Sequence, residues 1–582
     1  MKSKKQATRR TPRAQPGHVV AEASPVPRWP YAAGIAVAVA AAFEVYGPSL
    51  NGPFLFDDQY LPFGKPDFPL NSLRDWMAGV RPLLMFSYWV NYQLSELRTF
   101  SYHAFNVLFH AANASLLFFI VRKILEFAQV ERGRRDLLAG FAGALFLLHP
   151  VNSEAVGYVA SRSENMSVLF FFGAFAAFLY RRTAGCSWAR AAAILVLFAA
   201  AALTKEHTVV LPVLLLLTDY FWNPPFSFDG IRRNWRLYGP VAAGGVLMGL
   251  FVARQLGGAQ TAGFGMKDLK WYEYFFTQCR ALWVYIRLFL FPAGLNADYD
   301  FPISRGILDH GAIFGFIAIV LAGAVAFYYR RRYPLAAYGF FSFVILMAPT
   351  SSFVPIKDPL AERRLYLSMI GLLFIALEFL RRVNVKEAKW LAGLATVLVL
   401  AGVFTYQRNI VWSDAVMLWE DTVAKSPKKS RDQFQLAQAY YERGQCGKAL
   451  PHYDAAAKLD SSDDRLFIDW GLAFDCLNQP DQALVKFRKA AEVKPTAHVY
   501  SQIGMIFGKQ GRNAEALEAL ATAQKLDPRF EMTYVYRGGV RLSTGDVAAA
   551  IQEFRQALAI NPQNQPASQG LAMAETRLRT GR

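Results

Sequence analysis

The sequence has 582 residues, of which 54% are hydrophobic, and a formal net charge of +19. A chain of this length exceeds one compact domain, and its apolar runs end near residue 405, so two architectures are expected. A positive charge of this size could suggest binding to nucleic acid. The Lys and Arg residues lie instead in short clusters between apolar runs, where they would orient membrane helices, and this distribution argues against a nucleic-acid-binding protein.

The first thirty residues are basic and contain several prolines. We predict that residues 1–30 form a disordered cytoplasmic tail. The apolar stretch from Tyr31 to Val45 follows, and a signal peptide is the competing interpretation of it. No small-x-small cleavage site precedes a soluble domain, which favours an uncleaved membrane helix.

Eleven apolar segments are candidate membrane spans, and many are close to the ~20 residues that a helix needs to cross hydrocarbon. They lie at residues 31–46, 104–122, 137–149, 164–180, 190–204, 207–222, 237–254, 309–329, 335–349, 364–380 and 389–405. The basic clusters fall in alternate loops, so we expect those loops and the N-terminus in the cytoplasm. An odd number of spans then places the C-terminus, and the first loop at 47–101, outside.

A twelfth apolar segment, from Trp271 to Pro292, is interrupted by Arg280 and Arg287 and is rich in aromatic residues. If it crossed the membrane, the later basic loops would lie outside. We therefore expect it to be an interfacial helix within an outer loop at 255–308, because aromatic rings and snorkelling Arg side chains suit the interface.

The C-terminal part, residues 411–582, contains a repeat with a period of about 34, typical of tetratricopeptide repeats. Small residues at fixed offsets let the paired helices approach closely, and a proline ends each unit. The matching positions are Ala449, Tyr453; Gly471, Phe474, Ala483, Phe487, Ala490, Pro495; Gly504, Ala516, Ala523, Pro528; and Gly538, Ala550, Phe554, Ala557, Pro562. We predict four units and a closing helix at 565–579. Such arrays bind peptides on their concave face, and a spacer or dimerisation arm is the alternative.

Four cysteines define no metal or redox centre by their spacing. Cys446 and Cys476 fall in neighbouring repeats. They either form one disulfide, if the repeats lie in an oxidising compartment, or remain two buried thiols, which is the commoner outcome.

Asp57 and Asp58 follow the first span within Phe-Leu-Phe-Asp-Asp. Apolar and aromatic neighbours raise the pKa of a carboxyl group and suit it to be a general base. A helix cap or turn is the alternative for an isolated pair of this kind.

Other ionisable residues lie at the predicted outer ends of the spans, where such groups are costly and usually functional. They are His149, Glu154, Lys205, Glu206, Glu362, Arg363 and Arg364. The cations Lys205, Arg363 and Arg364 would suit a lipid phosphate, because Arg recognises phosphate oxygens with a forked geometry. Ion pairing of Lys205 with Glu206 or Glu154 is the structural alternative.

The first loop also contains Arg81, which would suit a site for a lipid headgroup. His103 and His110 lie two turns apart on one helical face, too far apart for one metal site without other ligands. Helix-packing hydrogen bonds are the default interpretation of the two histidines.

Seven short stretches, in this order, resemble the transmembrane and tetratricopeptide repeat-containing protein O-mannosyltransferases. They are Phe56-Asp57-Asp58, Arg81-Pro82-Leu83, Tyr102-His103 with Asn106-Val107 and His110, His149-Pro150-Val151 with Glu154-Ala155-Val156, Ser161-Arg162, Lys205-Glu206, and Glu362-Arg363-Arg364-Leu365-Tyr366-Leu367-Ser368. The segment Phe291–Tyr299 is similar to that family's long outer loop. The array here is shorter than in the animal members.

The resemblance implies an all-α fold: a GT-C-type glycosyltransferase domain at 31–410 followed by a tetratricopeptide α-solenoid. It implies transfer of a single sugar, such as mannose, from a polyprenyl-phosphate donor to a protein Ser or Thr hydroxyl outside the cytoplasm, in a bacterial inner membrane or its ER equivalent. Asp57 or Asp58 would be the base. The residues that would bind substrate are Arg81, His103, His149, Glu154, Arg162, Lys205, Glu206, Glu362, Arg363, Arg364 and Tyr366.

The expected partners are the lipid-linked donor, membrane lipids and a protein acceptor held by the repeats. No metal ligand is assigned, and participation of a divalent cation, Mg²⁺ or Mn²⁺, stays open. Two rival functions are an O-antigen ligase or oligosaccharyltransferase, in which late outer-loop Arg and His residues should dominate, and a non-catalytic membrane-anchored scaffold.

Overall fold

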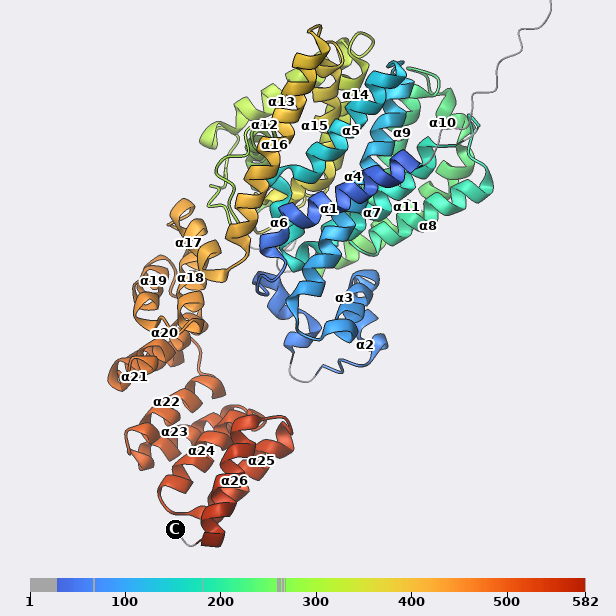
Figure 1. The fold of residues 1–582 in the computed structure, drawn as a ribbon. Coiled ribbons are helices and arrows are strands. Elements are labelled where there is room, and N and C mark those ends of the chain that lie inside the picture. Colours follow the sequence, from blue (N-terminus) through green and yellow to red (C-terminus); the bar gives the residue numbers. More distant parts are fainter. Residues whose placement is uncertain are drawn as a thin grey trace, which may run out of the picture.

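The computed structural model describes residues 29–65, 68–181, 183–258, 263, 266 and 268–580. The predicted tail lies outside these residues up to residue 28. Helices make up both the bundle and the arm that extends from one of its ends (Figure 1). The expectation of an all-α chain is therefore confirmed.

Each of the eleven predicted spans contains a helix. These helices are α1(Trp29–Val45), α4(Thr99–Phe127), α5(Arg132–Leu148), α7(Arg162–Leu179), α8(Trp188–Ala202), α9(Leu211–Trp222), α11(Trp235–Gly258), α13(Ala312–Tyr328), α14(Pro334–Met347), α15(Leu365–Leu380) and α16(Glu387–Trp412). Within the described residues, three helical stretches are long and apolar enough to cross a membrane: Thr99–Phe127, Asp309–Tyr328 and Glu387–Trp412. Shorter apolar helices are α1, α8 and α14.

The bundle is packed tightly where α14 meets α15. A Cβ atom on Gly339 would lie 2.5 Å from the carbonyl oxygen of Gly371, and one on Gly371 would lie 2.5 Å from the backbone nitrogen of Phe343. Real Cβ atoms do not approach backbone so closely. The two glycines therefore allow the helices to pack backbone against backbone, as small residues do between membrane helices.

Short helices connect the long ones. They are η1(Gly47–Ser49), η2(Phe56–Tyr60), η3(Pro62–Gly64), α2(Leu73–Met77), α3(Pro82–Ser95), η4(Pro150–Asn152), α6(Ser153–Gly157), η5(Val159–Ser161), η6(Glu206–Val210), α10(Asp229–Arg233), η7(Asp309–Gly311) and η8(Glu362–Arg364). In Figure 1, α2, α3 and α6 lie at the end of the bundle from which the arm extends. The polar residues singled out in the sequence are concentrated in this group.

The predicted interfacial segment forms α12(Trp271–Leu290). Three of its side chains bond to the segment that precedes α15: the Tyr274 hydroxyl donates to the Thr350 carbonyl, Gln278 Nε2 donates to the Pro359 carbonyl, and the Tyr285 hydroxyl accepts from the Ala361 amide. One face of α12 thus braces the loop that carries η8.

The arm consists of α17(Ala415–Lys425) followed by helical hairpins. Their helices are α18(Ser430–Glu442), α19(Cys446–Leu459), α20(Asp464–Cys476), α21(Pro480–Val493), α22(Ala497–Lys509), α23(Asn513–Leu526), α24(Glu531–Ser543), α25(Val547–Ile560) and α26(Gln565–Thr580). The tetratricopeptide pattern is confirmed in detail, since a Cβ atom on Gly471, Gly504 or Gly538 would lie 2.6–2.8 Å from a side chain of the partner helix.

Cys446 and Cys476 form a disulfide between the start of α19 and the end of α20, with their Cα atoms 6.4 Å apart. The structure thus has the disulfide in place of two buried thiols. Cys186 and Cys279 are free and buried in the bundle.

Candidate active site

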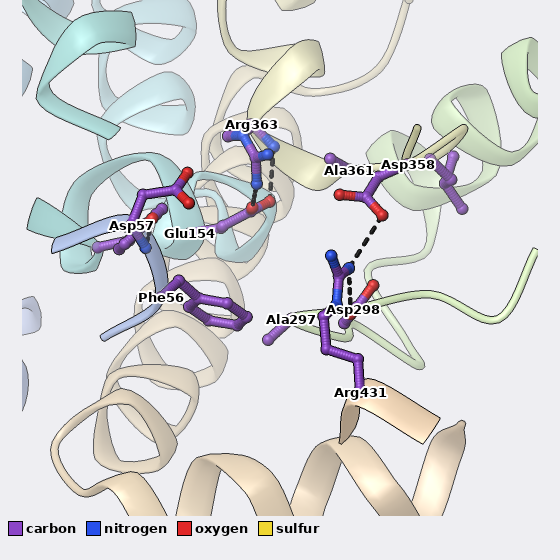
Figure 2. A pocket seen from close by; sticks show the side chains of 11 residues that line it. Phe56, Asp57, Glu154, Ala297, Asp298, Asp358, Ala361, Arg363 and Arg431 are labelled. Atoms are coloured by element: carbon purple, nitrogen blue, oxygen red, sulfur yellow. Dashed lines mark hydrogen bonds and ion pairs between the residues drawn. The ribbon is translucent and has the colours of Figure 1, made fainter. Parts of the chain in front are cut away.

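A polar cavity lies where the short connecting helices meet the base of the arm (Figure 2). It draws on segments far apart in the chain. The residues that line it are Phe56, Asp57, Glu154, Tyr158, Ala297, Asp298, Asp358, Leu360, Ala361, Arg363 and Arg431. Three of them, Asp57, Glu154 and Arg363, are among the residues singled out in the sequence.

Asp57 and Asp58 point in different directions although they are neighbours on η2. Asp58 is buried, and its two carboxylate oxygens accept from the backbone amides of Leu55, at 3.0 Å, and Ala160, at 2.7 Å. Burial raises the pKa of Asp58 to about 8. Asp57 is exposed and its carboxylate faces the cavity in Figure 2. Asp57 is therefore the carboxylate that the cavity can use as a candidate base. Asp58 links two segments of the chain through its hydrogen bonds to Leu55 and Ala160.

The turn that presents Asp57 is held from the side of the arm. Phe56 has a φ of +47°, which non-glycine residues rarely adopt. Its ring packs against Tyr158, with centroids 5.5 Å apart, and against Trp419 of α17, at 4.7 Å. The Tyr158 hydroxyl also accepts from the Asp57 amide at 2.8 Å. Packing and a hydrogen bond thus fix an unfavourable backbone conformation next to the candidate base.

Glu154 and Arg363 form an ion pair that lines the cavity (Figure 2). The Arg363 backbone amide also donates to Glu154, at 2.8 Å. Glu154 is buried, whereas the Arg363 side chain is 30% exposed. The negative charge of Glu154 and its hydrogen bond keep the Arg363 guanidinium charged despite burial, which alone would lower its pKa.

Another part of the cavity lining consists of ion pairs between the bundle and the arm. Arg431, on α18, donates from Nε to Asp298 Oδ2 at 2.6 Å and from Nη2 to Asp358 Oδ1 at 2.9 Å. Lys429 pairs with the same Asp298 carboxylate. Burial would raise the pKa of Asp358, but the charges of Arg431 and Lys429 hold it below its ordinary value.

A second charged cluster adjoins the cavity. Arg81 makes a forked pair with Glu206, with donor–acceptor distances of 2.9 and 2.8 Å. Lys205 pairs with Glu164, a residue that the sequence reasoning did not single out. Burial lowers the pKa of Lys205. The Glu164 carboxylate acts in the opposite direction, and the positive charge of Arg363 lowers the pKa further. Arg363 is thus close enough to link the two clusters electrostatically.

Glu362 lies beside the cavity and is buried. Its Oε1 accepts from the Asn296 amide at 2.6 Å and from the Tyr299 hydroxyl at 2.7 Å, while Oε2 has no hydrogen-bond partner among the described residues. Burial raises its pKa to about 7. Glu362 thus anchors the loop that contains Asn296 and Tyr299.

Arg162 and Arg364 have structural surroundings. Arg162 is fully buried and donates to Asn106 Oδ1 at 3.0 Å and to the backbone carbonyls of Ser87 and Tyr102 at 3.1 and 2.9 Å. Arg364 donates to the Tyr274 hydroxyl at 3.0 Å, the Pro359 carbonyl at 2.9 Å and the Asp358 carbonyl. Both guanidinium groups are occupied by hydrogen bonds within the protein, that of Arg162 to α3 and α4 and that of Arg364 to α12 and the loop before η8.

His103, His149 and Tyr366 are likewise buried in hydrogen bonds. The imidazole Nε2 atoms of His103 and His149 pair with the carbonyls of Gly52, at 3.2 Å, and Phe289, at 3.0 Å. The Tyr366 hydroxyl lies 2.8 Å from His110 Nδ1 and 3.0 Å from Asn113 Nδ2. None of the three lines the cavity.

The amino-acid sequence is similar to those of several protein O-mannosyl-transferases. Protein O-mannosyl-transferase TMTC3 of Mus musculus is 23% identical over 607 residues, which cover 91% of this chain and 64% of the mouse protein. TMTC3 of Homo sapiens is 22% identical and covers 94% and 66%. Protein O-mannosyl-transferase F38B6.6 of Caenorhabditis elegans is 24% identical and covers 72% and 61%.

This chain is a homologue of the protein O-mannosyl-transferases over most of its length. It spans between 61% and 66% of the length of these three relatives. The tetratricopeptide repeat family matches residues 502–565. A thermophilic TPR protein of Thermus thermophilus aligns with 31% of this chain and 94% of its own at 18% identity and a TM-score of 0.26, too low to carry an argument.

The cavity of this O-mannosyl-transferase homologue offers few unpaired carboxylates to a divalent cation. Glu154 is paired with Arg363, Asp298 with Lys429 and Arg431, and Asp358 with Arg431. Across the described ranges, no cluster of three or more His, Cys, Asp or Glu side chains is arranged to hold a metal ion. These residues do not fit Mg²⁺ or Mn²⁺, which prefer several free oxygen ligands.

Sequence reasoning missed four residues that line the cavity: Tyr158, Asp298, Asp358 and Arg431. Asp298 lies in the stretch similar to the O-mannosyltransferase outer loop, which was a usable signal. Arg431 begins the repeat pattern, and nothing in that pattern indicates contact with the bundle.

Proposed function

We propose that this protein is a membrane glycosyltransferase that transfers one sugar, a hexose such as mannose, from a polyprenyl-phosphate donor to a Ser or Thr hydroxyl of a protein. Its similarity to protein O-mannosyl-transferases over most of the chain supports this assignment. The structural observation that most directly supports the proposed function is the cavity lined by the exposed Asp57 carboxylate and the Glu154–Arg363 pair.

In the proposed reaction the acceptor hydroxyl oxygen attacks the anomeric carbon of the donor sugar. A carbon–oxygen bond forms there as the bond from that carbon to the phosphate oxygen breaks. The bonding electrons leave with the polyprenyl phosphate, and the hydroxyl proton passes to Asp57. A positioned base and preorganised positive charge are the two elements that such a transfer requires.

Arg363 is the cation best suited to receive the phosphate. Its side chain is 30% exposed and faces the cavity, and its present partner is a carboxylate. A phosphate can replace that carboxylate because both present two oxygens to the guanidinium fork. The neighbouring Lys205 and Arg81, each already paired with a glutamate, would contribute positive potential at longer range.

We further propose that the cavity and the repeats lie outside the cytoplasm, on about eleven spans with a cytoplasmic N-terminus. The basic loops support this orientation through the positive-inside rule. The Cys446–Cys476 disulfide supports it independently, because disulfides persist in oxidising compartments and are rare in the cytosol.

The repeats would hold the acceptor protein. Arg431 of α18 lines the same cavity as Asp57, so an acceptor segment lying along the arm would enter the cavity beside the base.

The test is a glycoproteomic comparison of cells that contain the wild-type protein, the Asp57→Asn variant or no protein. Loss of a hexose from Ser or Thr sites in the variant and in the deletion strain is expected. Asp75→Asn, which changes an exposed carboxylate on α2 of the same loop, serves as the control. If the hexose modification is unchanged in the deletion strain, the proposed enzyme is excluded and the non-catalytic scaffold is the remaining function.

A further inference from the structure

A long apolar groove lies on the bundle and shares no lining residue with the cavity. It has a volume of about 630 Å³, within the range of ligand-binding sites. Its walls are α1 and α5, and α4 contributes Ala114, Ser115, Phe118 and Phe119 between them. On α5 the lining residues recur every three or four positions, so that one whole face of the helix borders the groove: Arg132, Asp136, Gly140, Gly143, Ala144, Leu147 and Leu148.

Glycines make the groove deep. A Cβ atom on Gly34 of α1 or on Gly140 of α5 would meet no other atom within 4 Å. These glycines therefore do not serve close helix packing, in contrast to Gly339 and Gly371. They leave space that a larger side chain could fill without touching the rest of the bundle.

The groove has charged residues at only one end. Arg132 and Asp136 lie there, while the other end is closed by Leu147 and Leu148. Asp136 is already neutralised by Arg122, at 2.7 Å, whereas Arg132 is exposed and pairs with no carboxylate of the described chain. Residues 122–136 contain five cations (Arg122, Lys123, Arg132, Arg134, Arg135) and three carboxylates (Glu126, Glu131, Asp136), a net charge of +2.

We propose that this groove is a binding site for an anionic glycerophospholipid, with an acyl chain between α1 and α5 and the headgroup phosphate at Arg132. An apolar channel with a cation at one end matches the chemistry of such a lipid. The site depends on membrane crossing by α1, α4 and α5, and it does not depend on the proposed transferase activity.

The phosphate at Arg132 is not that of the sugar donor, a distinction that rests on the proposed function. In that function the donor phosphate lies beside Asp57 and Arg363, at the end of α5 that leads through His149 into α6. Arg132 begins the same helix, and 17 residues of α helix separate the two ends by roughly 25 Å. The lipid phosphate therefore lies on the opposite side of the bilayer from the cavity.

The experiment measures lipid retained by the purified full-length protein, using native mass spectrometry after exchange from vesicles of equal phosphatidylglycerol and phosphatidylethanolamine. We expect about one phosphatidylglycerol per wild-type chain, with the groove burying most of one acyl chain. Gly140→Phe should lower the retention of phosphatidylglycerol about tenfold or more, because the new side chain displaces part of the acyl chain. Displacement of about two methylene groups is enough for a loss of this size.

Gly393→Phe is the matched control, because Gly393 is an exposed α16 glycine that also has open space around its Cβ position and does not line the groove. Gly34→Leu fills the groove from α1 and is used if Gly140→Phe does not fold. Arg132→Gln should keep the chain site but remove the preference for phosphatidylglycerol. The proposal would be overturned if Gly140→Phe and Gly34→Leu retained as much lipid as the wild-type protein, or if Arg132→Gln kept the preference for phosphatidylglycerol. It would also be overturned if the purified protein retained polyprenyl phosphate in the groove. A change from dimer to monomer in Gly140→Phe without loss of lipid would overturn it too, because the groove would then be an interface between two copies of the chain.

Discussion

Arg431 of the first repeat helix donates to Asp298 of a loop of the bundle, with Nε 2.6 Å from Oδ2. Asp298 is 4% exposed, so this contact lies within the junction between the two parts of the protein. Lys429 pairs with the same carboxylate, and Arg431 also reaches Asp358. The base of the arm is therefore fixed to the bundle by a charged network at the cavity wall.

Removing both cations from Asp298 should loosen the base of the arm. The double variant Lys429→Met, Arg431→Gln leaves Asp298 as a buried charge without its partners, which typically costs on the order of 3 kcal/mol. Hydrogen exchange should become faster in the segments around 298 and 430. Adding Asp298→Asn should restore much of the protection, because it removes the unpaired charge. Protection unchanged in the double variant would show that apolar packing alone holds the arm.

Asp57→Asn should lower the rate of sugar transfer without unfolding the protein. The amide keeps the shape of an exposed side chain but cannot accept the proton, and loss of a general base typically lowers the rate by about 10² to 10⁴-fold. Transfer from a polyprenyl-phosphate sugar to a Ser- or Thr-containing peptide measures the rate, with the thermal unfolding midpoint as the check on folding. A variant that transfers normally would remove Asp57 from the mechanism.

Asp58→Asn should change how stability depends on pH. Burial raises the pKa of Asp58 from 3.8 to about 8, so the folded protein binds a proton that the unfolded chain releases between these values. This contribution to stability is complete below about pH 4 and is lost as the pH rises through 8. The wild-type unfolding midpoint should therefore fall relative to that of Asp58→Asn over this interval.

Parallel curves for the two proteins would mean that Asp58 stays ionised, held by its two backbone amide donors. Asp75→Asn, an exposed carboxylate in the same loop, is the control for a non-specific change of charge.

Reduction of the Cys446–Cys476 disulfide should destabilise the first repeats. The bond joins residues 30 positions apart, and a loop of that length contributes roughly 2–4 kcal/mol by restricting the unfolded chain. Cys446→Ser with Cys476→Ser should lower the unfolding midpoint of the arm and remove its sensitivity to reductant. Cys186→Ala, at a free buried thiol of the bundle, should leave that sensitivity intact.

The sequence was most informative where one physical constraint acts on many residues. The helices of the bundle could be predicted because each is an apolar run, and the repeat hairpins because glycine and alanine must recur where helices touch, as Gly471 does against Phe487. Charge at the predicted outer ends of spans led to Asp57, Glu154 and Arg363, which line one cavity although they are far apart in the chain.

The direction of each side chain could not be predicted. Asp57 and Asp58 are identical neighbours, and only the turn at Phe56 makes one exposed and the other buried. Arg162 is a candidate substrate-binding residue in the sequence, but oxygen atoms of α3 and α4 accept its hydrogen bonds. The contact of Arg431 with the bundle depends on how two folded parts meet, which no local pattern encodes.

The stacking of Phe56 on Trp419 means that the arm is not a passive tether. The ring belongs to the residue directly before Asp57, and the indole belongs to the first helix after α16. A tilt of the arm about the end of α16 would therefore shift the indole against the turn that carries the Asp57 carboxylate, so that force on the repeats would act on the candidate base.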